Sequence, residues 1–456
     1  MSNVDNILQF QREYFACGET YDVGFRIRML KKLYTAIKDN EQQIYEALRK
    51  DLNKPEMEAY MCEIGIVFTE IKHMLKHIKR YAGKKYRKTR LAQFGSKNFT
   101  QNCPYGNVLI VSPWNYPFLL TFDPLVHAIA TGNTAIIKPS AYCEHSSQVI
   151  KMIIEKTFDE KYVACILGGR EQNAELFDKK FDLVFFTGSS VVGREIATKC
   201  GQSLTPVLLE LGGKSPCIVG ASANLENAAR RIVFGKLMNA GQTCVAPDYL
   251  FCHESIKDKL IQLLIKEIKE QFGENLLENP EYGKIINKKH FDRVLSLINP
   301  DKVVYGGKYD EVTLKIEPTI MDGVTDDDAV MKEEIFGPLF PIMTYNKVEE
   351  VLSYVRSKPE PLALYVFSED KKVVDYITLQ VPFGGGCIND TVMQLASLDM
   401  GFGGVGESGT GAYHGKAGFE AFSHKKSVNE KTGIDLPFRY RPYTKKKEKL
   451  IKKILN

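Results

Sequence analysis

The sequence lacks the features that mark several classes of protein. Its ten cysteines form no Cys-x-x-Cys pair and no cysteine–histidine cluster at the spacing of metal ligands, so we expect no bound metal. No apolar run approaches the roughly 18 residues that suggest a membrane-spanning helix. The opening segment, MSNVDNILQF, is polar and has no signal-peptide pattern. We therefore expect a soluble, cytoplasmic protein whose cysteines are reduced and mostly buried.

A large excess of charge of one sign is also absent. The chain carries 61 basic and 56 acidic residues, which gives a formal net charge of +5 over 456 residues. So small an excess does not indicate a nucleic-acid partner. With 44% hydrophobic residues the chain can bury a large core, and its length indicates two or three domains.

Short apolar runs that end in small or polar residues follow a mainly helical start over residues 1–80. Four of these runs, separated by helical stretches, are GNVLIVSP, NTAIIKPS, YVACILGG and DLVFFTGS. This alternation predicts a parallel sheet covered on both faces, with ligands bound beyond the carboxyl ends of its strands. A second alternating region runs from PVLLELGGKSPCIVG to about Asp390. We therefore predict an α/β fold with two α/β domains and a cleft between them.

The segment DLVFFTGSSVVGREIATK joins an expected strand to an expected helix. Thr187 ends the strand, and Gly188 and Gly193 bracket the turn. The free N–H groups at the start of a helix suit a pyrophosphate. The pattern is GxxxxG and not the GxGxxG dinucleotide motif, so an ordinary strand–turn–helix junction explains it equally well.

Cys244, in GQTCVAP, is the candidate nucleophile among the ten cysteines. Its small and polar neighbours leave the sulfur approachable, whereas Cys217 and Cys252 lie in apolar, strand-like runs. The local pattern alone does not decide between a reactive and a structural thiol.

Two polar residues at strand ends are further candidates. Glu210, in LELGGKSP, could serve as a general base beside a cleft, although a solvated loop glutamate explains it better when it is taken alone. Asn115, in SPWNYPF, could donate to an oxyanion or simply hold the turn. The only tryptophan, Trp114, is expected to pack rather than react.

Taken together, these segments resemble the aldehyde dehydrogenase superfamily. The resemblance covers almost the whole chain and rests on SPWNYPF, GNTAIIKPS, FTGSSVVG, LELGGKSP, GQTCVAPDYL, EEIFGPLFP, FGGGCIND and FGGVGESG, which appear in the family's order. The short length, the wording GQTCVAPDY and the segment RYRPYT resemble the class 3 branch. The resemblance implies a Rossmann-like cofactor domain, an α/β catalytic domain and a small oligomerisation element.

The resemblance also implies catalytic roles. Cys244 matches the nucleophile, Glu210 the general base, and Asn115 the side chain that forms the oxyanion hole with the Cys244 N–H. The implied reaction is NAD(P)-dependent oxidation of an aldehyde through a thiohemiacetal and a thioester, which water hydrolyses. Lys236 matches a class 3 lysine near the active site.

The implied cofactor is NAD or NADP. Lys138 matches a lysine that contacts the adenosine ribose, Glu334 the residue that holds the nicotinamide ribose, and Phe336 a neighbour of the nicotinamide ring. The remaining predicted cofactor contacts are Trp114, Gly188, Ser189 and Gly193. Many relatives have a glutamate where this chain has Ala141, and a carboxylate there would repel a 2′-phosphate. We expect NADP to be used at least comparably with NAD, unless other contacts set the preference.

The resemblance further implies domain boundaries and a homodimer. Residues 1–82 and 104–209 would form the cofactor domain, and residues 210–426 the catalytic domain. Residues 83–103 and 427–456 would form the oligomerisation element and the C-terminal tail. The tail KKKEKLIKKILN could lie on a membrane surface, but its short apolar stripe favours a solvated or subunit-bound tail, so we do not expect membrane association.

The substrate is the least defined part of the prediction. Tyr60, Met61, Met238 and Met393 suggest an apolar or aromatic tunnel, and hence medium-chain or aromatic aldehydes, although each could equally be ordinary core. Tyr413 and His414 fall where class 3 members place residues near the substrate funnel, although a solvated histidine is the favoured reading of His414. Two alternatives stay open: a CoA-acylating dehydrogenase, against which Glu210 argues, and a non-catalytic protein of the same fold, against which the retained catalytic residues argue.

Overall fold

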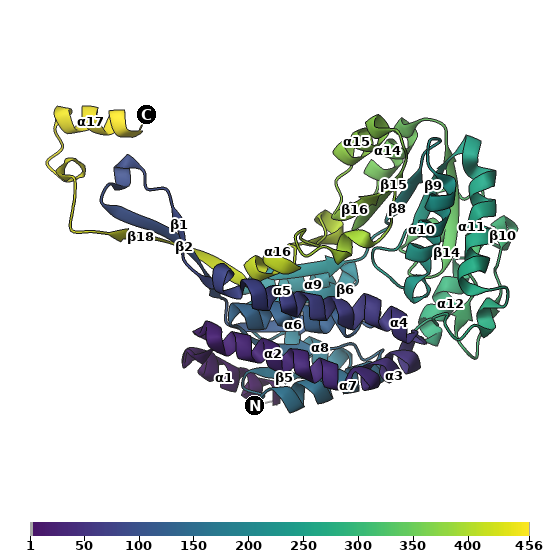
Figure 1. Ribbon diagram of the computed structural model, residues 1–456, viewed down its shortest axis with the longest axis horizontal. Coiled ribbons are helices and arrows are strands. Elements are labelled where there is room, and N and C mark those ends of the chain that lie inside the picture. The colour runs from purple at the N-terminus through teal and green to yellow at the C-terminus, as the bar shows by residue number, and fades with distance from the viewer. Residues whose placement is uncertain (1–2, 456) are drawn as a thin grey trace.

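Two sheet-based lobes and a projecting arm organise the chain in the computed structural model, which describes residues 3–455 (Figure 1). The first lobe is built on a six-stranded sheet and the second on a seven-stranded sheet. Helices cover both sheets, which confirms the predicted α/β class.

The first sheet has the strand order β17-β7-β6-β3-β4-β5. All of its neighbouring strands are parallel except the pair of β17 and β7. The strands are β3 (Asn107–Val111), β4 (Thr134–Lys138), β5 (Val163–Cys165), β6 (Leu183–Gly188), β7 (Val207–Leu211) and β17 (Gly409–Thr410). The chain leaves β3 first toward β4 and then returns to β6 on its other side. The order reverses between β3 and β6, and doubly wound sheets bind ligands at such a point.

Both faces of this sheet are buried, because successive side chains of a strand point to opposite faces. In β3, Val108 and Ile110 belong to one apolar core, and Leu109 and Val111 belong to a second. The second core is closed by α1 (Asn3–Ala16), α8 (Arg170–Phe177) and α9 (Ser190–Gln202). The first core is closed by α2 (Val23–Asp39), α5 (Gly65–Ala82), α6 (Leu119–Thr131) and α7 (Glu144–Thr157). The short helices α3 (Glu41–Leu52) and α4 (Glu56–Ala59) lie between α2 and α5 in the chain.

The helical start of the chain follows from its apolar spacing. In α2 the buried positions include Leu30, Leu33 and Ile37, which recur every three or four residues along one face. Asp22 caps the helix by accepting from the N–H groups of Gly24 and Phe25. The predicted helical segment is therefore confirmed.

The second sheet has the order β10-β13-β14-β9-β8-β15-β16 and is parallel except at β10. Its strands are β8 (Pro216–Val219), β9 (Tyr249–His253), β10 (Val303–Tyr305), β13 (Thr319–Met321), β14 (Leu339–Tyr345), β15 (Ala363–Phe367) and β16 (Gly385–Ile388). Figure 1 shows α10 (Leu225–Leu237) and α11 (Lys257–Phe272) on one side of this sheet, and α14 (Val348–Arg356) and α15 (Lys371–Gln380) on the other. The lobe also contains α12 (Lys288–Ser296), α13 (Ala329–Lys332) and the hairpin of β11 (Tyr309–Asp310) and β12 (Lys315–Ile316).

Two segments belong to the first lobe although the predicted boundaries assign them to the second domain. Gly409 of β17 pairs with Glu210 of β7, and α16 (Gly415–Ala421) packs on α5 and α6. The predicted boundary between residues 209 and 210 also falls inside β7. A two-residue strand has no periodicity that the sequence could reveal, so the return of the chain to the first sheet was not predicted.

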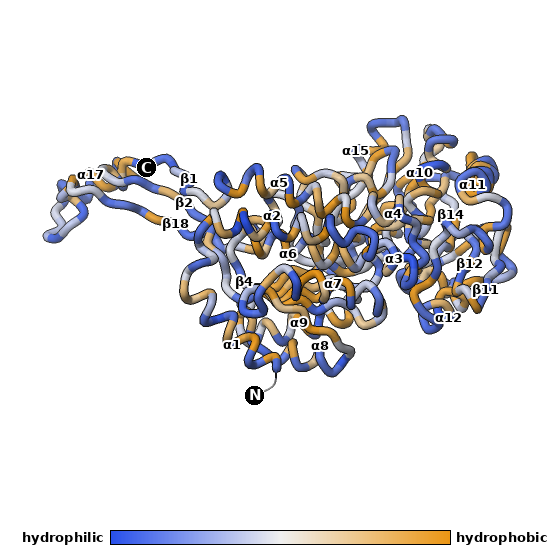
Figure 2. The backbone as a smooth tube through the Cα atoms, turned by 60° about the horizontal axis from the view of Figure 1, so that its bottom comes forward, coloured by the Kyte–Doolittle hydropathy of each residue, from blue (hydrophilic) through white to orange (hydrophobic). Residues whose placement is uncertain are grey.

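The arm is a three-stranded antiparallel sheet in the order β1-β2-β18. It consists of β1 (Lys85–Arg87), β2 (Ser96–Pro104) and β18 (Ser423–Lys431), and α17 (Lys445–Leu455) lies at its far end (Figure 1). In Figure 2 the arm is mainly hydrophilic, with a few hydrophobic residues, whereas the lobes contain long hydrophobic segments. Within residues 3–455, none of the helices has the length and apolar character to cross a membrane.

Candidate active site

The candidate catalytic residues meet at the switch point of the first sheet. Asn115 follows β3, Gly188 ends β6, and Glu210 lies near the end of β7. These strands are parallel, and Thr187 is directly opposite Glu210, so their carboxyl ends share one edge. Cys244 reaches this edge from the second lobe, on the loop between α10 and β9. Residues from both lobes therefore meet at this edge of the first sheet.

Cys244 belongs to the walls of two cavities. The first has a volume of about 950 Å³ and contains most of the predicted cofactor contacts. It is lined by Pro113, Trp114, Asn115, Thr187, Gly188, Ser189, Glu210, Leu211, Gly212, Cys244, His290, Arg293, Glu333, Glu334 and Phe336. We refer to it as the polar cavity.

The second cavity has a volume of about 890 Å³ and is walled almost entirely by apolar and aromatic side chains. Its lining is Met61, Cys62, Ile66, Tyr116, Leu119, Leu120, Phe234, Met238, Thr243, Cys244, Val245, Val392, Met393, Leu395, Ala396, Phe402, Tyr413 and His414. We refer to it as the apolar cavity. Of the residues that line either cavity, Cys244 alone lines both, so it is the point that the two cavities share.

Asn115 is held in place by buried polar groups that the sequence did not indicate. Its backbone carbonyl accepts from Lys54 Nζ at 3.1 Å and from Asn239 Nδ2 at 2.8 Å. Lys54 also pairs with Glu63 at 2.6 Å, and both side chains are fully buried. Glu63 in turn accepts from the backbone N–H of Phe118 at 2.8 Å. The main chain at Asn115 is therefore fixed independently of its own side chain.

The Asn115 side chain keeps a free donor. Its Nδ2 donates to the carbonyl of Gln242 at 3.1 Å, which uses one of the two N–H groups of the amide. Its Oδ1 is buried without a hydrogen-bond partner in the described chain. Because Asn115 lines the polar cavity beside Cys244, the second N–H can serve an oxyanion formed at the sulfur.

The turn before Cys244 has an uncommon backbone conformation. Asn239 and Ala240 both have φ of 51°, in the left-handed region that non-glycine residues rarely occupy, and Gly241 follows at 79°. The N–H of Asn239 donates to Glu58 Oε1 at 2.8 Å, and its side chain donates to the carbonyl of Gln242 at 3.2 Å. Such conformations persist where the surroundings over-determine them, as these hydrogen bonds do here.

Glu210 is 2% exposed and its two carboxylate oxygens lack a hydrogen-bond partner in the described chain. Burial raises the pKa of this carboxyl well above its usual range. A raised pKa and unused oxygens facing a cavity are the properties of a general base that takes a proton from water.

Burial likewise raises the pKa of the Cys244 thiol, and the nearby carboxylates of Glu334 and Glu210 raise it further. The backbone N–H groups of Cys244 and Val245 act in the opposite direction and lower it. The two carboxylates therefore disfavour the thiolate electrostatically, and the two N–H groups favour it.

The loop that carries Glu334 and Phe336 is fastened from two sides. Lys214 bridges Asp248 and the carbonyl of Glu333, and Asp248 accepts from the N–H of Ile335 at 2.9 Å. On the other side, Arg293 donates to the carbonyls of Glu334 at 3.1 Å and Ile335 at 2.6 Å. The Glu334 carboxylate lies against Gly212, where there is no room for a Cβ, and burial raises its pKa to about 8.

Aromatic rings line one side of the polar cavity. Trp114 meets Phe336 edge to face with ring centroids 5.3 Å apart, and the His290 ring lies 5.1 Å from that of Trp114. The Tyr142 ring lies 5.7 Å from that of His290. Burial lowers the pKa of His290 to about 4, so this ring is neutral at physiological pH. His290 and Arg293 were not predicted, because they lie on α12, in a segment that matches none of the recognised motifs.

Four of the predicted site residues lie outside both cavities, and their roles stay predictions. Gly193 is inside α9 and lets the helix pack on Leu211, so it does not border the cavity. Lys138 ends β4, and its Nζ donates to the carbonyl of Pro139 at 2.8 Å. Tyr60 is 47% exposed, and Lys236 is fully buried. None of these four residues lines the polar or the apolar cavity.

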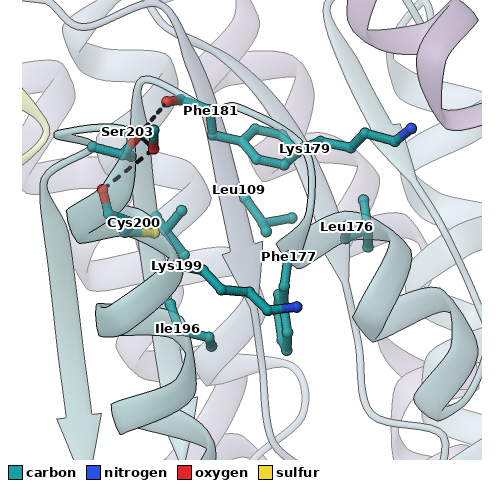
Figure 3. A pocket seen from close by; sticks show the side chains of 11 residues that line it. Leu109, Leu176, Phe177, Lys179, Phe181, Ile196, Lys199, Cys200 and Ser203 are labelled. Carbon is teal, nitrogen blue, oxygen red and sulfur yellow. Dashed lines mark hydrogen bonds between the residues drawn. The ribbon is translucent and has the colours of Figure 1, made fainter.

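A third, smaller cavity lies on the face of the first sheet that α8 and α9 cover. Figure 3 shows it between α8, α9 and the sheet, with the rings of Phe177 and Phe181 and the side chains of Leu109 and Ile196 turned toward it. The amino groups of Lys179 and Lys199 extend outward to Asp5 and Asp178. None of the candidate site residues lines this cavity, so it belongs to the core packing.

Comparison with known proteins adds independent evidence. The sequence model of the aldehyde dehydrogenase family matches residues 2–428. The chain is 47% identical over 444 residues to 4,4'-diaponeurosporen-aldehyde dehydrogenase of Staphylococcus aureus, and the alignment covers 96% of this chain and 97% of that protein. It is 40% identical over 428 residues to a dimeric NADP-preferring aldehyde dehydrogenase of Mus musculus, with 94% of each covered. The solved substrate-bound state of Staphylococcus aureus AldH superposes with a TM-score of 0.98 at 46% identity and covers 100% of both chains.

Proposed function

The chain belongs to the aldehyde dehydrogenase family, and we propose that it oxidises apolar aldehydes to carboxylic acids through a thioester on Cys244. It is an oxidoreductase that acts on aldehydes with NAD or NADP. The proposal for the mechanism depends above all on one observation: Cys244 lines both the polar cavity and the apolar cavity.

The polar cavity fits a nicotinamide dinucleotide. It opens at the switch point of the first sheet and beside Ser189, which precedes the first turn of α9. Trp114 and Phe336 would border the nicotinamide ring, and Glu334 would hold its ribose. When bound there, the cofactor would supply the hydride acceptor for the oxidation.

The first step is assigned to the Cys244 sulfur. It adds to the carbonyl carbon of an aldehyde that enters through the apolar cavity, and its proton passes to Glu210 or Glu334. The carbonyl oxygen becomes an oxyanion, which the Asn115 amide and the Cys244 N–H stabilise. Loss of a hydride from the resulting thiohemiacetal leaves a thioester on Cys244.

The second step is assigned to Glu210. Its carboxylate takes a proton from a water molecule as the oxygen adds to the thioester carbonyl. The carbon–sulfur bond then breaks, the carboxylic acid leaves, and Cys244 is regenerated. The free oxygens of Glu210 and its raised pKa support this assignment.

The lining of the apolar cavity supports an aldehyde with an extended apolar or aromatic body. Met61, Met238 and Met393 contribute to it, and flexible methionines adapt to varied apolar shapes. The lining has few polar side chains, chiefly those of Thr243, Cys244 and His414. Because the Staphylococcus aureus relative is named for 4,4'-diaponeurosporen-aldehyde, a long polyene aldehyde belongs in the substrate panel beside medium-chain and aromatic ones.

Two further properties are part of the proposal. The exposed Ala141 puts no carboxylate near the predicted adenosine ribose site, and we propose that NADP is used at least as well as NAD. The arm leaves the edges of β1 and β18 without a strand partner in the described chain, and we propose that it joins two copies into a homodimer. Light scattering during gel filtration measures the second property directly, and a monomer would contradict it.

The testing experiment is the formation of reduced nicotinamide by purified protein. Aliphatic, aromatic and polyene aldehydes are offered with NAD or NADP, with and without CoA, and Cys244→Ala is run alongside. CoA-independent turnover that disappears in the variant supports the proposal and ranks the substrates. Turnover that requires CoA would overturn Glu210 as the base of a hydrolytic step.

A further inference from the structure

Four ionisable side chains form a buried cluster that the proposed reaction does not use. Glu70 lies on α5, Asp123 and His127 lie one turn apart on α6, and His414 precedes α16. Glu70, Asp123 and His127 are fully buried, and His414 is 3% exposed. Burying charged or polar groups is costly unless each one finds a partner.

Hydrogen bonds leave most of this cluster unsatisfied. Within residues 3–455, Glu70 is the one side chain of the cluster with a hydrogen-bond partner, since its two oxygens accept from the Gly415 N–H at 3.2 and 3.0 Å. Both oxygens of Asp123, both ring nitrogens of His127 and Nδ1 of His414 have no partner in the described chain. These atoms nevertheless point toward one another, and one ligand atom from each of Glu70, Asp123 and His127 lies within 4.8 Å of the other two.

The separations match those between ligands of one metal ion. His127 Nε2 is 3.5 Å from Asp123 Oδ1 and 3.8 Å from Glu70 Oε1. These distances are too long for good hydrogen bonds. Ligands that each lie about 2.0–2.2 Å from a tetrahedral Zn²⁺ are roughly 3.3–3.6 Å apart, and wider when the angle opens.

We propose that Glu70, Asp123 and His127 bind one divalent first-row transition metal ion, of which Zn²⁺ is the best match. One imidazole and two carboxylates form a common ligand set for such ions, and they leave a fourth position for water. Two carboxylates also neutralise the charge of a divalent ion, so the buried site carries no net charge. The fully buried donors without partners provide the second observation that distinguishes this site from a chance cluster of acids.

The site would stabilise the wall of the apolar cavity. Asp123 approaches His127 with Oδ1, and its other oxygen, Oδ2, lies 3.4 Å from His414 Nδ1. A metal-bound Asp123 would therefore fix the orientation of the His414 ring. The His414 ring stacks on Tyr413 with centroids 4.4 Å apart, and both residues line the cavity. The metal would thus link α5, α6 and the segment before α16, a structural function that goes beyond the proposed oxidation.

The test is the metal content of full-length protein purified without a polyhistidine tag. Inductively coupled plasma mass spectrometry after gel filtration should find about one transition metal ion per chain. Asp123→Asn and His127→Gln should each reduce this content at least tenfold. His77→Gln is the matched control. The rings of His73 and His77 on α5 have centroids 4.7 Å apart, and this pair could bind adventitious metal. Cys244→Ser excludes metal held by the active-site thiol.

A second measurement does not depend on the folding of the variants. Chelator-treated wild-type protein that binds cofactor normally is titrated with Co²⁺, and visible absorption bands of four- or five-coordinate Co²⁺ are expected. The proposal is overturned if wild-type protein neither retains metal nor gives these bands. It is also overturned if metal is lost in His77→Gln or Cys244→Ser and kept in Asp123→Asn and His127→Gln.

Discussion

Replacing Asn115 by alanine should slow turnover without displacing the active-site loop. Lys54 and Asn239 hold the backbone carbonyl of Asn115, which the substitution leaves in place. The variant loses one hydrogen bond to the carbonyl of Gln242, which costs about 1 kcal/mol of stability. Folding should therefore survive, and the loss should appear in catalysis.

The size of the catalytic loss follows from the donor that is removed. An oxyanion-hole donor contributes on the order of 3 kcal/mol in the transition state, so kcat should fall by about two to three powers of ten. The predicted cofactor contacts of Trp114, Glu334 and Phe336 remain, and the KM for NAD or NADP should change little. The signature is a drop in kcat and in kcat/KM for the aldehyde of similar size.

The assay is the initial rate of reduced-nicotinamide formation at saturating cofactor, together with the amplitude and rate of its first turnover. Asn115→Asp is the matched control, because it keeps the size of the side chain and removes the N–H donor. Both variants should be slow if donation matters. Turnover of Asn115→Ala within tenfold of the wild-type value, from protein that still binds cofactor, would refute the oxyanion assignment.

Three other perturbations have defined outcomes. Because burial raises the pKa of Glu210 and only its carboxylate accepts a proton, thioester hydrolysis measured by rapid quench should accelerate as pH rises through that pKa, and Glu210→Gln should remove this rise. Lys54→Met leaves the fully buried Glu63 without its lysine partner and should lower the free energy of unfolding by about 3–5 kcal/mol. The urea midpoint should fall, and adding Glu63→Gln to the same chain should partly restore it. An unchanged midpoint would contradict the pairing. Ala141→Glu should raise the KM for NADP relative to NAD by roughly tenfold, because a new carboxylate repels the 2′-phosphate; steady-state constants that strongly favour NAD before and after the change would contradict the expected preference.

The site residues that could be predicted from the sequence are those that lie within recognisable motifs. The apolar runs before Asn115 and Glu210 predict parallel strands, and parallel strands bring their ends together. The order of eight motifs then singles out Cys244 among ten cysteines. Local patterns were sufficient because each of these residues lies within a few positions of a strand end or a glycine turn.

The supporting residues could not be predicted, because their partners are remote in sequence. Lys54 and Glu63 lie in a segment with a helical pattern, where charged residues usually face solvent, yet both contact the loop near Asn115 about sixty positions away. Asp123 and His127 likewise form a cluster with Glu70 only because α6 packs against α5. Packing determines which polar side chains are buried, and no periodicity in the sequence shows it.

Covalent capture of the intermediate tests the central claim most directly. Glu210→Gln protein is mixed with cofactor and an apolar aldehyde, quenched in acid and measured by intact and peptide mass spectrometry, with Cys244→Ser as the control. The predicted result is an adduct on Cys244 that equals the aldehyde mass less two hydrogens, absent from Cys244→Ser, and released as the acid by the wild-type enzyme. Oxidation of the aldehyde without any adduct on Cys244, or with an adduct on another residue, would contradict the account.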